Sequence, residues 1–309
     1  MRSDCRCQTQ TLTFRPVTLA DKPWLDDIIR QEDARSAEWC FSGIFAWRDT
    51  YHQQVASIGN RLMIRLICHG PPFYAFPIGK GDLEAAIWAM HQDVAQFNAP
   101  LMMRGLTEKT KTELEEAFPG QFIFTPDPNA FDYIYEAESL ATLAGKKLHA
   151  KRNHINRFVE NNPDWVFEPL TRETLPQCIA MTRAWALHQQ KDDTFASELL
   201  ALHQAFTHYE ALELEGGLLR ADGEVIAFTI GEPINSDTYI IHFEKAFSDI
   251  QGAYPMINRE FARHIRRTHP HIRYINREDD MGIESLQKAK RSYYPAFMLE
   301  KYTALWRDL

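Results

Sequence analysis

Residues Thr238–Arg267, TYIIHFEKAFSDIQGAYPMINREFARHIRR, decide the fold that the sequence predicts. The stretch begins with alternating apolar residues, which predict a strand. Further on, Ile257, Phe261 and Ile265 recur every four residues, which predicts an amphipathic helix. Pro255 suits the first helical turn because its missing N–H would have no partner there. A strand therefore leads through a short turn directly into a helix.

The turn itself reads Gln251-Gly252-Ala253-Tyr254. Gly252 permits backbone conformations that a side chain would block, and the free N–H groups of a helix N-terminus favour an anion. We therefore predict that these four residues bind the phosphate groups of a co-substrate. The turn resembles the acyl-CoA turn of GNAT acyltransferases, Gln/Arg-x-x-Gly-x-Gly/Ala, although Asp249 stands where that pattern has Gln or Arg. A plain connection between a strand and a helix is the alternative interpretation.

A repeated segment indicates that the chain contains two copies of one unit. FRPVTLADKP begins at Phe14 and FEPLTRETLP begins at Phe167, so Phe, Pro, Thr and a second Pro recur at one constant offset. Each half then continues with a helix, antiparallel strands, a glycine turn, a helix and a strand, which predicts an α/β unit with a mixed sheet. The predicted ranges are a mobile N-terminus at 1–10, a first domain at 11–142 that is degenerate and structural, a connecting helix at 143–162, and a second domain at 163–309 with the active site.

Composition limits the classes of protein that remain. The 309 residues are 45% hydrophobic and 12% aromatic, which is ample for packed cores, and the net charge of -8 argues against a generally basic nucleic-acid-binding surface. The five cysteines show no zinc spacing and no paired pattern typical of disulfide scaffolds, so we expect reduced thiols and a cytoplasmic protein. We expect no transmembrane segment and no metal site, while peripheral contact with a membrane stays compatible with the sequence.

Basic residues are concentrated on one flank of the predicted connecting helix, LAGKKLHAKRNHINRFVENN. At 100° per residue, Lys147, Lys151 and Arg157 fall within the same third of its circumference. Lys and Arg add affinity for phosphates without reading a sequence, so these three residues could bind the pyrophosphate of CoA or the backbone of a tRNA acceptor stem. A solvated helix face is the alternative interpretation.

Three segments together resemble a known family: AGKKLHAKRNHINRF, FEKAFSDIQGAYPMINREFA and INREDDMGIESLQKAKRSYYPAFMLEKY. They are similar to the C-terminal domain of phosphatidylglycerol lysyltransferases, and the resemblance extends from about Leu12 to Tyr302. It implies a tandem GNAT fold and a relation to enzymes that transfer an aminoacyl group from tRNA to a lipid or peptide. The lysyltransferases carry a long membrane-spanning region before this domain, and this sequence has none, which puts a phospholipid acceptor in doubt.

Acyl transfer needs a base for the acceptor and an acid for the leaving group. If the fold is as predicted, Glu244 on the strand before the turn would face the reacting ester or thioester and act as the base. We place the reaction centre between that strand, which ends at Phe247, and the next strand, which ends near Glu278. Asp279 and Asp280 would flank the donor there, although Asp280 could instead cap the helix that starts near Ile283.

The remaining predicted site residues are polar groups of the C-terminal segment. The resemblance implies that a tyrosine near the last helix acts as the general acid, and Tyr294 is our candidate, with Tyr293 beside it and a buried core role as the alternative. The predicted substrate-binding residues are Asn276, Glu278, Lys288 and Lys290.

Three functions follow from this sequence. The first is an aminoacyltransferase that takes its donor from aminoacyl-tRNA and uses a small-molecule or peptide amine, or a hydroxyl group, as acceptor. The second is an N-acyltransferase that uses acyl-CoA. The third is a non-catalytic binding or regulatory protein that keeps the fold. We expect no tightly bound cofactor, because aminoacyl-tRNA or acyl-CoA would be a co-substrate.

Overall fold

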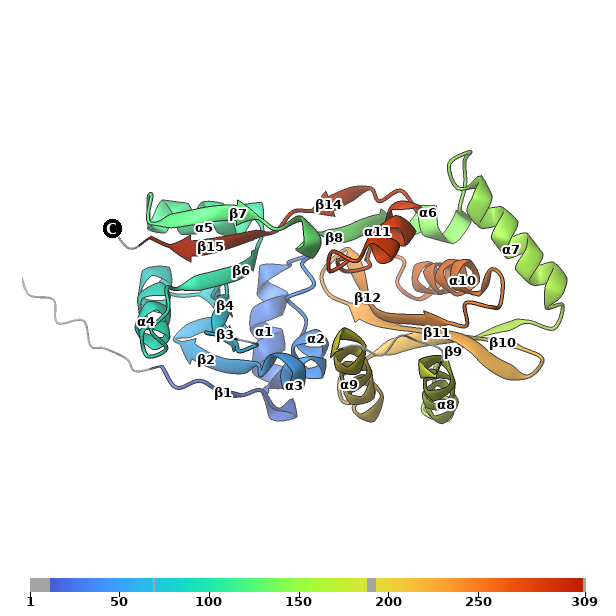
Figure 1. Ribbon diagram of the computed structural model, residues 1–309, viewed down its shortest axis with the longest axis horizontal. Helices are drawn as coiled ribbons and strands as arrows, with labels where there is room; N and C mark the ends of the chain where they lie inside the picture. Colours follow the sequence, from blue (N-terminus) through green and yellow to red (C-terminus); the bar gives the residue numbers. More distant parts are fainter. Residues whose placement is uncertain (1–11, 69, 188–192, 308–309) are drawn as a thin grey trace, which may run out of the picture. The chain divides into compact units, whose positions relative to one another are not determined.

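The computed structural model describes residues 12–68, 70–187 and 193–307 (Figure 1). Within them the chain forms two compact units. Unit 1 contains residues 12–32, 47–127 and 301–307, and unit 2 contains residues 33–46 and 128–300. The predicted mobile segment at 1–10 lies outside the described residues.

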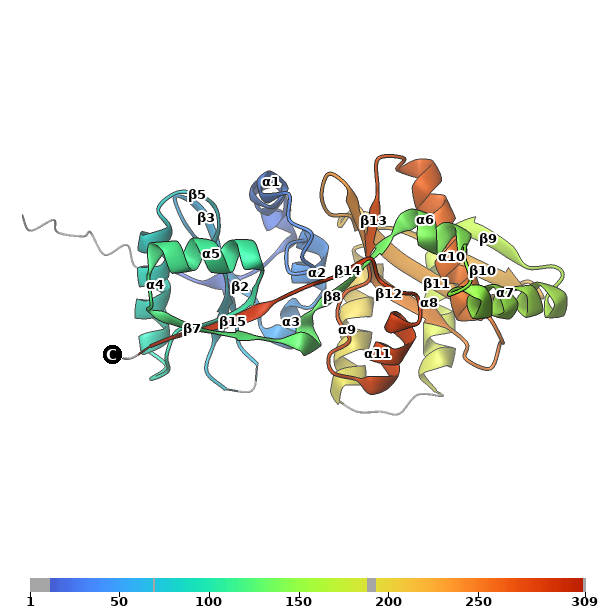
Figure 2. The same ribbon diagram turned by 90° about the horizontal axis from the view of Figure 1, so that it is seen from above.

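Unit 1 is built on one mixed sheet, whose strands lie in the order β1-β2-β3-β4-β6-β15-β7, with β5 also paired to β3. Helix α5 packs on β6 and β15 (Figure 2), and α1 packs on β3 and β5. Its elements are β1 (Arg15–Pro16), η1 (Leu19–Asp21), α1 (Lys22–Glu32), α3 (Arg48–Tyr51), β2 (Gln54–Ile58), β3 (Asn60–Leu66), β4 (Phe73–Ala75), β5 (Ile78–Lys80), α4 (Leu83–Ala95), β6 (Met102–Leu106), α5 (Glu108–Ala117), β7 (Phe122–Pro126) and β15 (Tyr302–Trp306).

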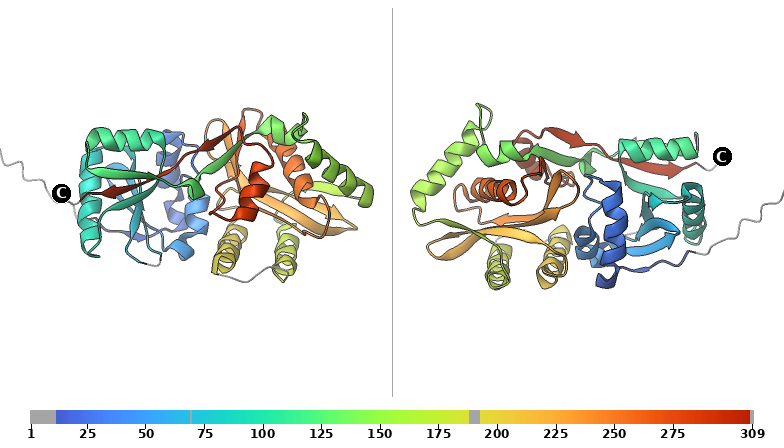
Figure 3. Two further views of the ribbon diagram at one scale, coloured as in Figure 1. Left: turned by 45° about the horizontal axis from the view of Figure 1, so that its top comes forward. Right: turned by 180° about the vertical axis from the view of Figure 1, so that it is seen from behind.

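Unit 2 is built on a second mixed sheet with the order β14-β8-β13-β12-β11-β10-β9. Helix α10 covers one face of β10–β12 and α8 packs on β11, while α6 and α7 lie along α10 (Figure 3). Its elements are α2 (Phe41–Ala46), η2 (Pro128–Ala130), β8 (Asp132–Glu136), α6 (Ala137–Thr142), α7 (His149–Asn161), β9 (Val166–Pro169), α8 (Leu175–Ala186), α9 (Asp193–Thr207), β10 (Glu215–Ala221), β11 (Glu224–Pro233), β12 (Thr238–Ala246), α10 (Ala253–Thr268), β13 (Tyr274–Asn276), α11 (Glu284–Arg291) and β14 (Phe297–Leu299).

The predicted fold class is confirmed, because both units are α/β with mixed sheets. The two strands expected from the repeated segment, β1 and β9, each form the edge of their sheet and pair antiparallel with the next strand along the chain. The predicted strand, turn and helix at 238–267 are β12, the turn at Gly252 and α10. Ile257, Phe261 and Ile265 of α10 are buried against the sheet, as their spacing predicts.

The division of the chain differs from the predicted ranges because the two halves exchange a strand. Strand β8 follows β7 in sequence, yet it pairs with β13 and β14 in unit 2. The C-terminal strand β15 pairs with β6 and β7 in unit 1. Each sheet therefore takes one strand from the other half of the sequence, and hydrogen-bond pairing, not chain order, sets the boundary.

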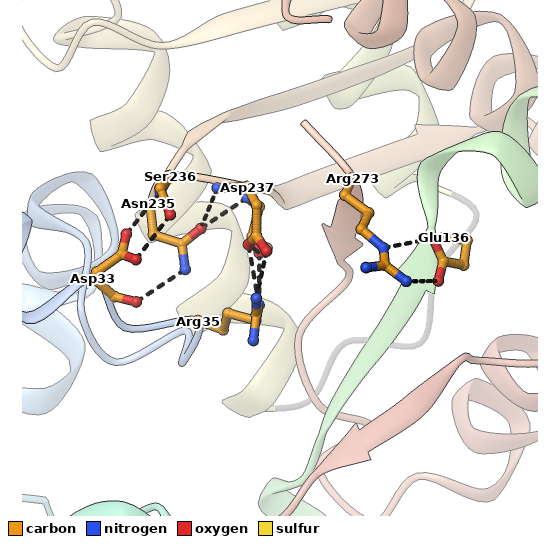
Figure 4. A network of polar contacts seen from close by, with 8 residues as sticks. Asp33, Arg35, Glu136, Asn235, Ser236, Asp237 and Arg273 are labelled. Carbon is orange, nitrogen blue, oxygen red and sulfur yellow. Dashed lines mark hydrogen bonds and ion pairs between the residues drawn. The ribbon is translucent and has the colours of Figure 1, made fainter. Parts of the chain in front are cut away.

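A second segment also departs from chain order. Residues 33–46, which precede most of unit 1, belong to unit 2. Polar contacts fix this segment (Figure 4): Ser236 N and Oγ donate to the carboxylate of Asp33 over 2.8 Å each, and Arg35 is ion-paired with Asp237. Nearby on the same sheet, Arg273 pairs with Glu136 over 3.3 Å and so links the loop before β13 to β8.

The predicted single helix at 143–162 is wrong in its first six residues. Helix α6 ends at Thr142, its C-cap Leu143 has a left-handed backbone (φ 49°), and α7 begins only at His149. A left-handed residue interrupts helical hydrogen bonding, so residues 143–148 are not helical, with α6 before them and α7 after them. Both pack on α10, and α7 is part of unit 2, not a connector between domains.

We expect Trp306→Ala in β15 to lower the free energy of unfolding of unit 1 by about 3–5 kcal/mol, because a large buried aromatic is lost. The Trp306 ring packs against Trp88 and Phe122 in that unit. Relative to the wild type, hydrogen–deuterium exchange in the variant should become faster in β6 and β7 and change less in β10–β12. Arg307→Ala, at an exposed position just past the strand, is the control. Equal loss of protection in both sheets would contradict the assignment of β15 to unit 1.

Candidate active site

Two neighbouring strands of unit 2 separate where the sequence predicts the reaction centre. β12 and β13 pair in parallel from Thr238↔Tyr274 to Ile240↔Asn276, and β12 then continues to Ala246 without β13. On its other side, β12 pairs Ile241 with Gly231 and Phe243 with Ile230, so His242 is an extra residue in a β-bulge. Bulges occur next to active sites because they redirect side chains and end pairing. Beyond Ile240, β12 therefore has an edge that β13 leaves uncovered.

The bulge decides which face of the sheet Glu244 takes. Ile241 lies before it in the core under α10, and Glu244, three residues later, faces the same helix. In a regular strand, residues three apart point to opposite faces. The extra residue thus places the Glu244 carboxylate beneath α10.

Glu244 is held there by two side chains. Arg277 Nη2 donates to Glu244 Oε1 over 2.8 Å, and Asn258 Nδ2 of α10 donates to Oε2 over 3.2 Å. The side chains of Glu244 and Arg277 are only 11% and 13% exposed. Burial by itself lowers the pKa of Arg277, but the Glu244 carboxylate and the Tyr135 and Tyr293 phenols act in the opposite direction, and the pKa is raised. Arg277 therefore stays cationic at any physiological pH.

Aromatic rings and a second cation complete this cluster. The Arg277 guanidinium lies 5.8 Å from the Tyr135 ring centroid and 5.1 Å from that of Tyr293. Lys151 of α7 places its Nζ 4.0 Å from the Tyr293 ring, an arrangement in which the ring attracts the charge. Burial and the neighbouring Arg277 lower the pKa of Lys151 to about 8, although Glu244 opposes this. Four elements of unit 2 thus contribute to one charged and aromatic site.

Two buried polar atoms beside Glu244 have no hydrogen-bond partner among the described residues. They are Oγ1 of Thr229 and Oδ1 of Asn258. Thr229 of β11 is the residue directly opposite Glu244 in the strand pairing. Thr229 is fully buried and Asn258 is 5% exposed. An unpaired buried polar atom costs about 1–3 kcal/mol, so such atoms usually bind an ordered water or a ligand group. A donor group on a bound substrate could satisfy Asn258 Oδ1.

The predicted phosphate-binding turn packs against helix α7 at Gly252. Gly252 has φ 86°, and a Cβ at this position would overlap the carbonyl oxygen of His154 and the side chain of Phe158 in α7. The glycine therefore allows α7 to approach the start of α10. Gln251 is exposed, Ala253 is buried, and the half-buried Tyr254 has a pKa raised by burial. Close packing of α7 explains Gly252 without a phosphate.

The three predicted basic residues of α7 and its approach lie in different environments. Lys147 and Arg157 are exposed. Lys151 is half-buried and reaches the Glu244–Arg277 cluster instead of the solvated flank. The sequence grouped Lys151 with two side chains that do not share its surroundings.

The predicted polar residues after β13 shape a tight loop. Asn276 is fully buried and donates to Asp132 Oδ2 over 3.0 Å, and its Oδ1 accepts from Glu278 N over 2.7 Å. Asp279 Oδ1 accepts from Met281 N over 3.2 Å. Asn276 thus uses its amide within the protein, and neither it nor Asp279 contacts Glu244. Glu278 approaches His242 on the other face of β12.

The expectation that Asp280 caps the last helix is wrong. The N-cap of α11 is Ile283, and it has no side-chain cap. Asp280 is 1% exposed and accepts from the Tyr133 hydroxyl over 2.6 Å and from Gly282 N over 2.9 Å. Burial raises the pKa of Tyr133, and its hydrogen bond to Asp280 adds to this. Asp280 therefore ties the loop to β8. Within the described residues, the hydrogen bonds of its side chain go to this loop, to β8 and to α11, and none goes to Glu244.

The remaining predicted residues of α11 separate into buried and exposed positions. Lys288 is exposed. Lys290 is 9% exposed, and its Nζ donates to the carbonyl oxygens of Arg277, over 2.6 Å, and Asp279; burial lowers its pKa to about 8. Tyr294, the predicted acid, is 50% exposed, whereas Tyr293 is 5% exposed and stacks within the cluster.

Arg277, Asn258 and Tyr135 are the site residues that the sequence did not single out. Arg277 stands within the INREDD segment. Its ion pair with Glu244 of β12 could not be inferred from the sequence, because the two residues meet only in the folded chain. Asn258 lies at a position whose helical spacing places it on the buried face of α10. A polar residue on that apolar face is a signal from which a site residue could have been predicted. Tyr135 belongs to the exchanged strand β8, whose position could not be read from its neighbours in sequence.

The mixed sheets, the separated strands and the helix that follows them define an α/β protein with a GNAT-like acyltransferase fold. Residues 30–305 match the family described as phosphatidylglycerol lysyltransferase, C-terminal, and the chain belongs to this family. The resemblance seen in the sequence is thereby confirmed.

Solved structures agree with this assignment. A conserved protein of unknown function from Bacteroides thetaiotaomicron VPI-5482 is 39% identical with a TM-score of 0.89, covering 96% of this chain and 100% of that one. The C-terminal domain of a putative lysylphosphatidylglycerol synthetase from Agrobacterium fabrum has a TM-score of 0.65 at 14% identity, over 94% and 93% of the two chains. A tandem GNAT protein from the clavulanic acid biosynthesis pathway has a TM-score of 0.50 at 12% identity, over 95% and 98%. The last two share the fold.

An uncharacterized protein of Mycoplasmoides gallisepticum is 28% identical over 178 residues, or 55% of this chain and 54% of that protein. The chain thus aligns with about half the length of this curated relative. In the part of the chain that the structure describes, every helix is too short or too polar to cross a membrane.

We expect Gly252→Ala to be more destabilising than Gly223→Ala. Both glycines have positive φ, so each substitution costs about 1–2 kcal/mol of backbone strain. Only at Gly252 does the added methyl meet α7, since Gly223 has open space around it. Overpacking adds about 1–3 kcal/mol. Denaturant unfolding of both variants measures the difference, and equal effects would contradict packing as the reason for Gly252.

We expect Lys290→Met to lower the free energy of unfolding by about 1–3 kcal/mol near pH 7, because two buried carbonyl oxygens lose their donor. Lys288→Met on the same helix is the matched control and should change it little. The lowered pKa of Lys290 means that the unfolded chain holds this proton more tightly. The wild type should therefore gain stability over Lys290→Met as the pH rises from about 8 toward 10.5. A pH-independent difference would contradict the lowered pKa.

Proposed function

We propose that this protein is an acyltransferase of the GNAT type that transfers an aminoacyl group from aminoacyl-tRNA to an amine or hydroxyl acceptor. One observation carries the proposal: the buried Glu244–Arg277 pair, with Lys151 beside it, lies where β12 loses its pairing with β13. An open strand edge offers backbone groups to an extended acyl chain, and the cluster offers charge at the same point.

The cations of the cluster suit a donor that develops negative charge. When the acceptor attacks the aminoacyl ester, the carbonyl oxygen becomes an oxyanion, which positively charged donors stabilise. Arg277 and Lys151 are both charged at neutral pH and both partly withdrawn from water, so their effect on a nearby oxyanion is larger than at a surface. Lys147 and Arg157, which are exposed, would contact the phosphate backbone of the acceptor stem.

Glu244 is the proposed proton acceptor. In the transfer, a new bond forms between the acceptor nitrogen or oxygen and the carbonyl carbon, and the ester bond to the ribose oxygen breaks. The acceptor loses a proton to Glu244, directly or through one water, and Glu244 returns this proton to the departing ribose oxygen, which leaves as a hydroxyl group. Arg277 and Asn258 hold the carboxylate in a fixed orientation, which supports this role.

The rival donor, acyl-CoA, receives less support. The turn that would bind the pyrophosphate is packed against α7 at Gly252, and Asp249 nearby is exposed and negatively charged. The family description names phosphatidylglycerol as an acceptor of its members, so a lipid hydroxyl and a peptide amine are the two acceptors to compare.

The experiment uses the full chain with lysyl-tRNA carrying labelled lysine, and with labelled acetyl-CoA as the rival donor. Acceptors are phosphatidylglycerol vesicles and a lysine-containing peptide. We expect label transfer from the tRNA, and we expect Glu244→Gln to lower turnover at least ~100-fold with little change in tRNA affinity. Asn258 can rotate its free Oδ1 toward the new amide, so the variant should keep its fold.

Glu224→Gln, at the exposed first residue of β11, is the control and should retain full turnover. Circular dichroism of each variant separates a lost fold from lost chemistry. Transfer from acetyl-CoA alone would overturn the choice of donor. Full activity of a folded Glu244→Gln variant would overturn the role of Glu244.

A further inference from the structure

A second polar cluster lies on the opposite face of β12 from Glu244. Cys40 beside α2, Glu232 on β11 and His242 in the bulge of β12 each present a ligand atom, and these atoms lie within 4.8 Å of one another. His242 Nε2 is 3.0 Å from Glu232 Oε1. All three residues belong to unit 2, and Cys40 and Glu232 are separated by most of the chain.

The second nitrogen of His242 is also fixed. Its Nδ1 lies 2.9 Å from Glu278 Oε1. With its proton on Nδ1 and donated to Glu278, the ring presents the lone pair of Nε2 toward Cys40 and Glu232. Metal-binding histidines commonly donate their other N–H to a carboxylate in this way, which fixes the tautomer.

We propose that Cys40, Glu232 and His242 bind a single Zn²⁺ ion. A thiolate, an imidazole nitrogen and a carboxylate oxygen are the ligand types that zinc takes in proteins. Two anionic ligands and one neutral ligand balance the charge of a divalent cation in a buried place. The hydroxyl of Ser42, 3.2 Å from His242 Nε2 and hydrogen-bonded to Glu232, borders the position of a fourth ligand, which water could occupy.

The surroundings of the cluster support a built site. A Cβ on Gly43 would lie 2.8 Å from Cys40 Sγ, so the glycine leaves room for the sulfur next to His242. The side chain of His242 is 5% exposed, whereas those of Glu232 and Glu278 are 15% and 29% exposed. An ion could therefore enter past the two carboxylates and become shielded from water.

The proposed ion would fasten parts of unit 2 that chain order does not hold together. Cys40 belongs to the segment 33–46, which Arg35 and Asp33 already tie to the loop before β12 (Figure 4). Binding through Cys40 would add a link from this segment to β11 and to the bulge. The role is structural, and it goes beyond the proposed aminoacyl transfer.

The sequence led us to expect no metal site, because the three proposed ligands do not lie at a short, recognisable spacing. The three ligands come from separate elements, and zinc motifs are recognised in sequence only when ligands lie a few residues apart. The bulge at His242 and the placement of residues 33–46 are both consequences of tertiary structure.

The test uses the full chain stripped of metal and titrated with Co²⁺, which replaces Zn²⁺ and reports its ligands by absorption. We expect about one Co²⁺ per chain, a near-ultraviolet band from thiolate-to-metal charge transfer, and displacement by Zn²⁺. Elemental analysis of the Zn²⁺-loaded protein checks the stoichiometry. Zn²⁺ should also raise the melting temperature, because it binds the folded chain selectively.

Cys40→Ala should abolish the charge-transfer band, and the matched control Cys178→Ala, at another buried cysteine, should keep it. Glu278→Gln should weaken metal affinity 10–100-fold, the usual effect of losing the carboxylate that orients a histidine ligand. Absence of stoichiometric Co²⁺ binding in the folded wild type would overturn the proposal, as would binding without a thiolate band. Either result would leave His242 as a hydrogen-bonded group between two carboxylates. If Cys40→Ala does not fold, the wild-type spectrum and Glu278→Gln still decide.

Discussion

Strand exchange is the constraint on which the rest of this structure depends. Backbone groups of a strand must be paired when buried, and β13 finds its second partner in β8, which the chain supplies after completing most of unit 1. In return, the C-terminal strand β15 fills the place between β6 and β7. Neither sheet is complete without a strand from the other half of the sequence. The exchange also brings Tyr135 of β8 into the site of unit 2.

The bulge at His242 places polar side chains on both faces of β12. One extra residue in β12 shifts its register with β11. Glu244 therefore points toward α10, while His242 and its carboxylate neighbours lie on the other face of the strand. The departure of β13 after Asn276 leaves the same part of β12 uncovered. Two polar clusters thus flank one short piece of strand, and each is buried enough for its charges to act strongly.

The structure places the residues that the sequence predicts for the site in different surroundings. Glu244 and Lys151 were expected on the basis of chain position and charge, and both lie in the cluster around Arg277. Tyr294 was expected as the acid, yet the adjacent Tyr293 is the buried ring, because the backbone turns at Tyr294 with φ 54°. Asn276 was expected to bind substrate, and in the structure its side-chain amide donates to Asp132. Residue type indicates which chemistry is available, and only packing assigns it to a ligand or to the fold.

The sequence by itself determined the two α/β copies, the strand–turn–helix at 238–267 and the family, because periodicity and turn residues act over a few neighbouring positions. It also located the stretch that contains the candidate site. Tertiary structure alone decided the strand exchange, the face of β12 on which Glu244 lies and the proximity of Cys40 to His242. These depend on hydrogen-bond pairing and on a one-residue bulge between segments far apart in the chain. A local pattern records which side chains are apolar, but it does not record which distant strand will pair with them.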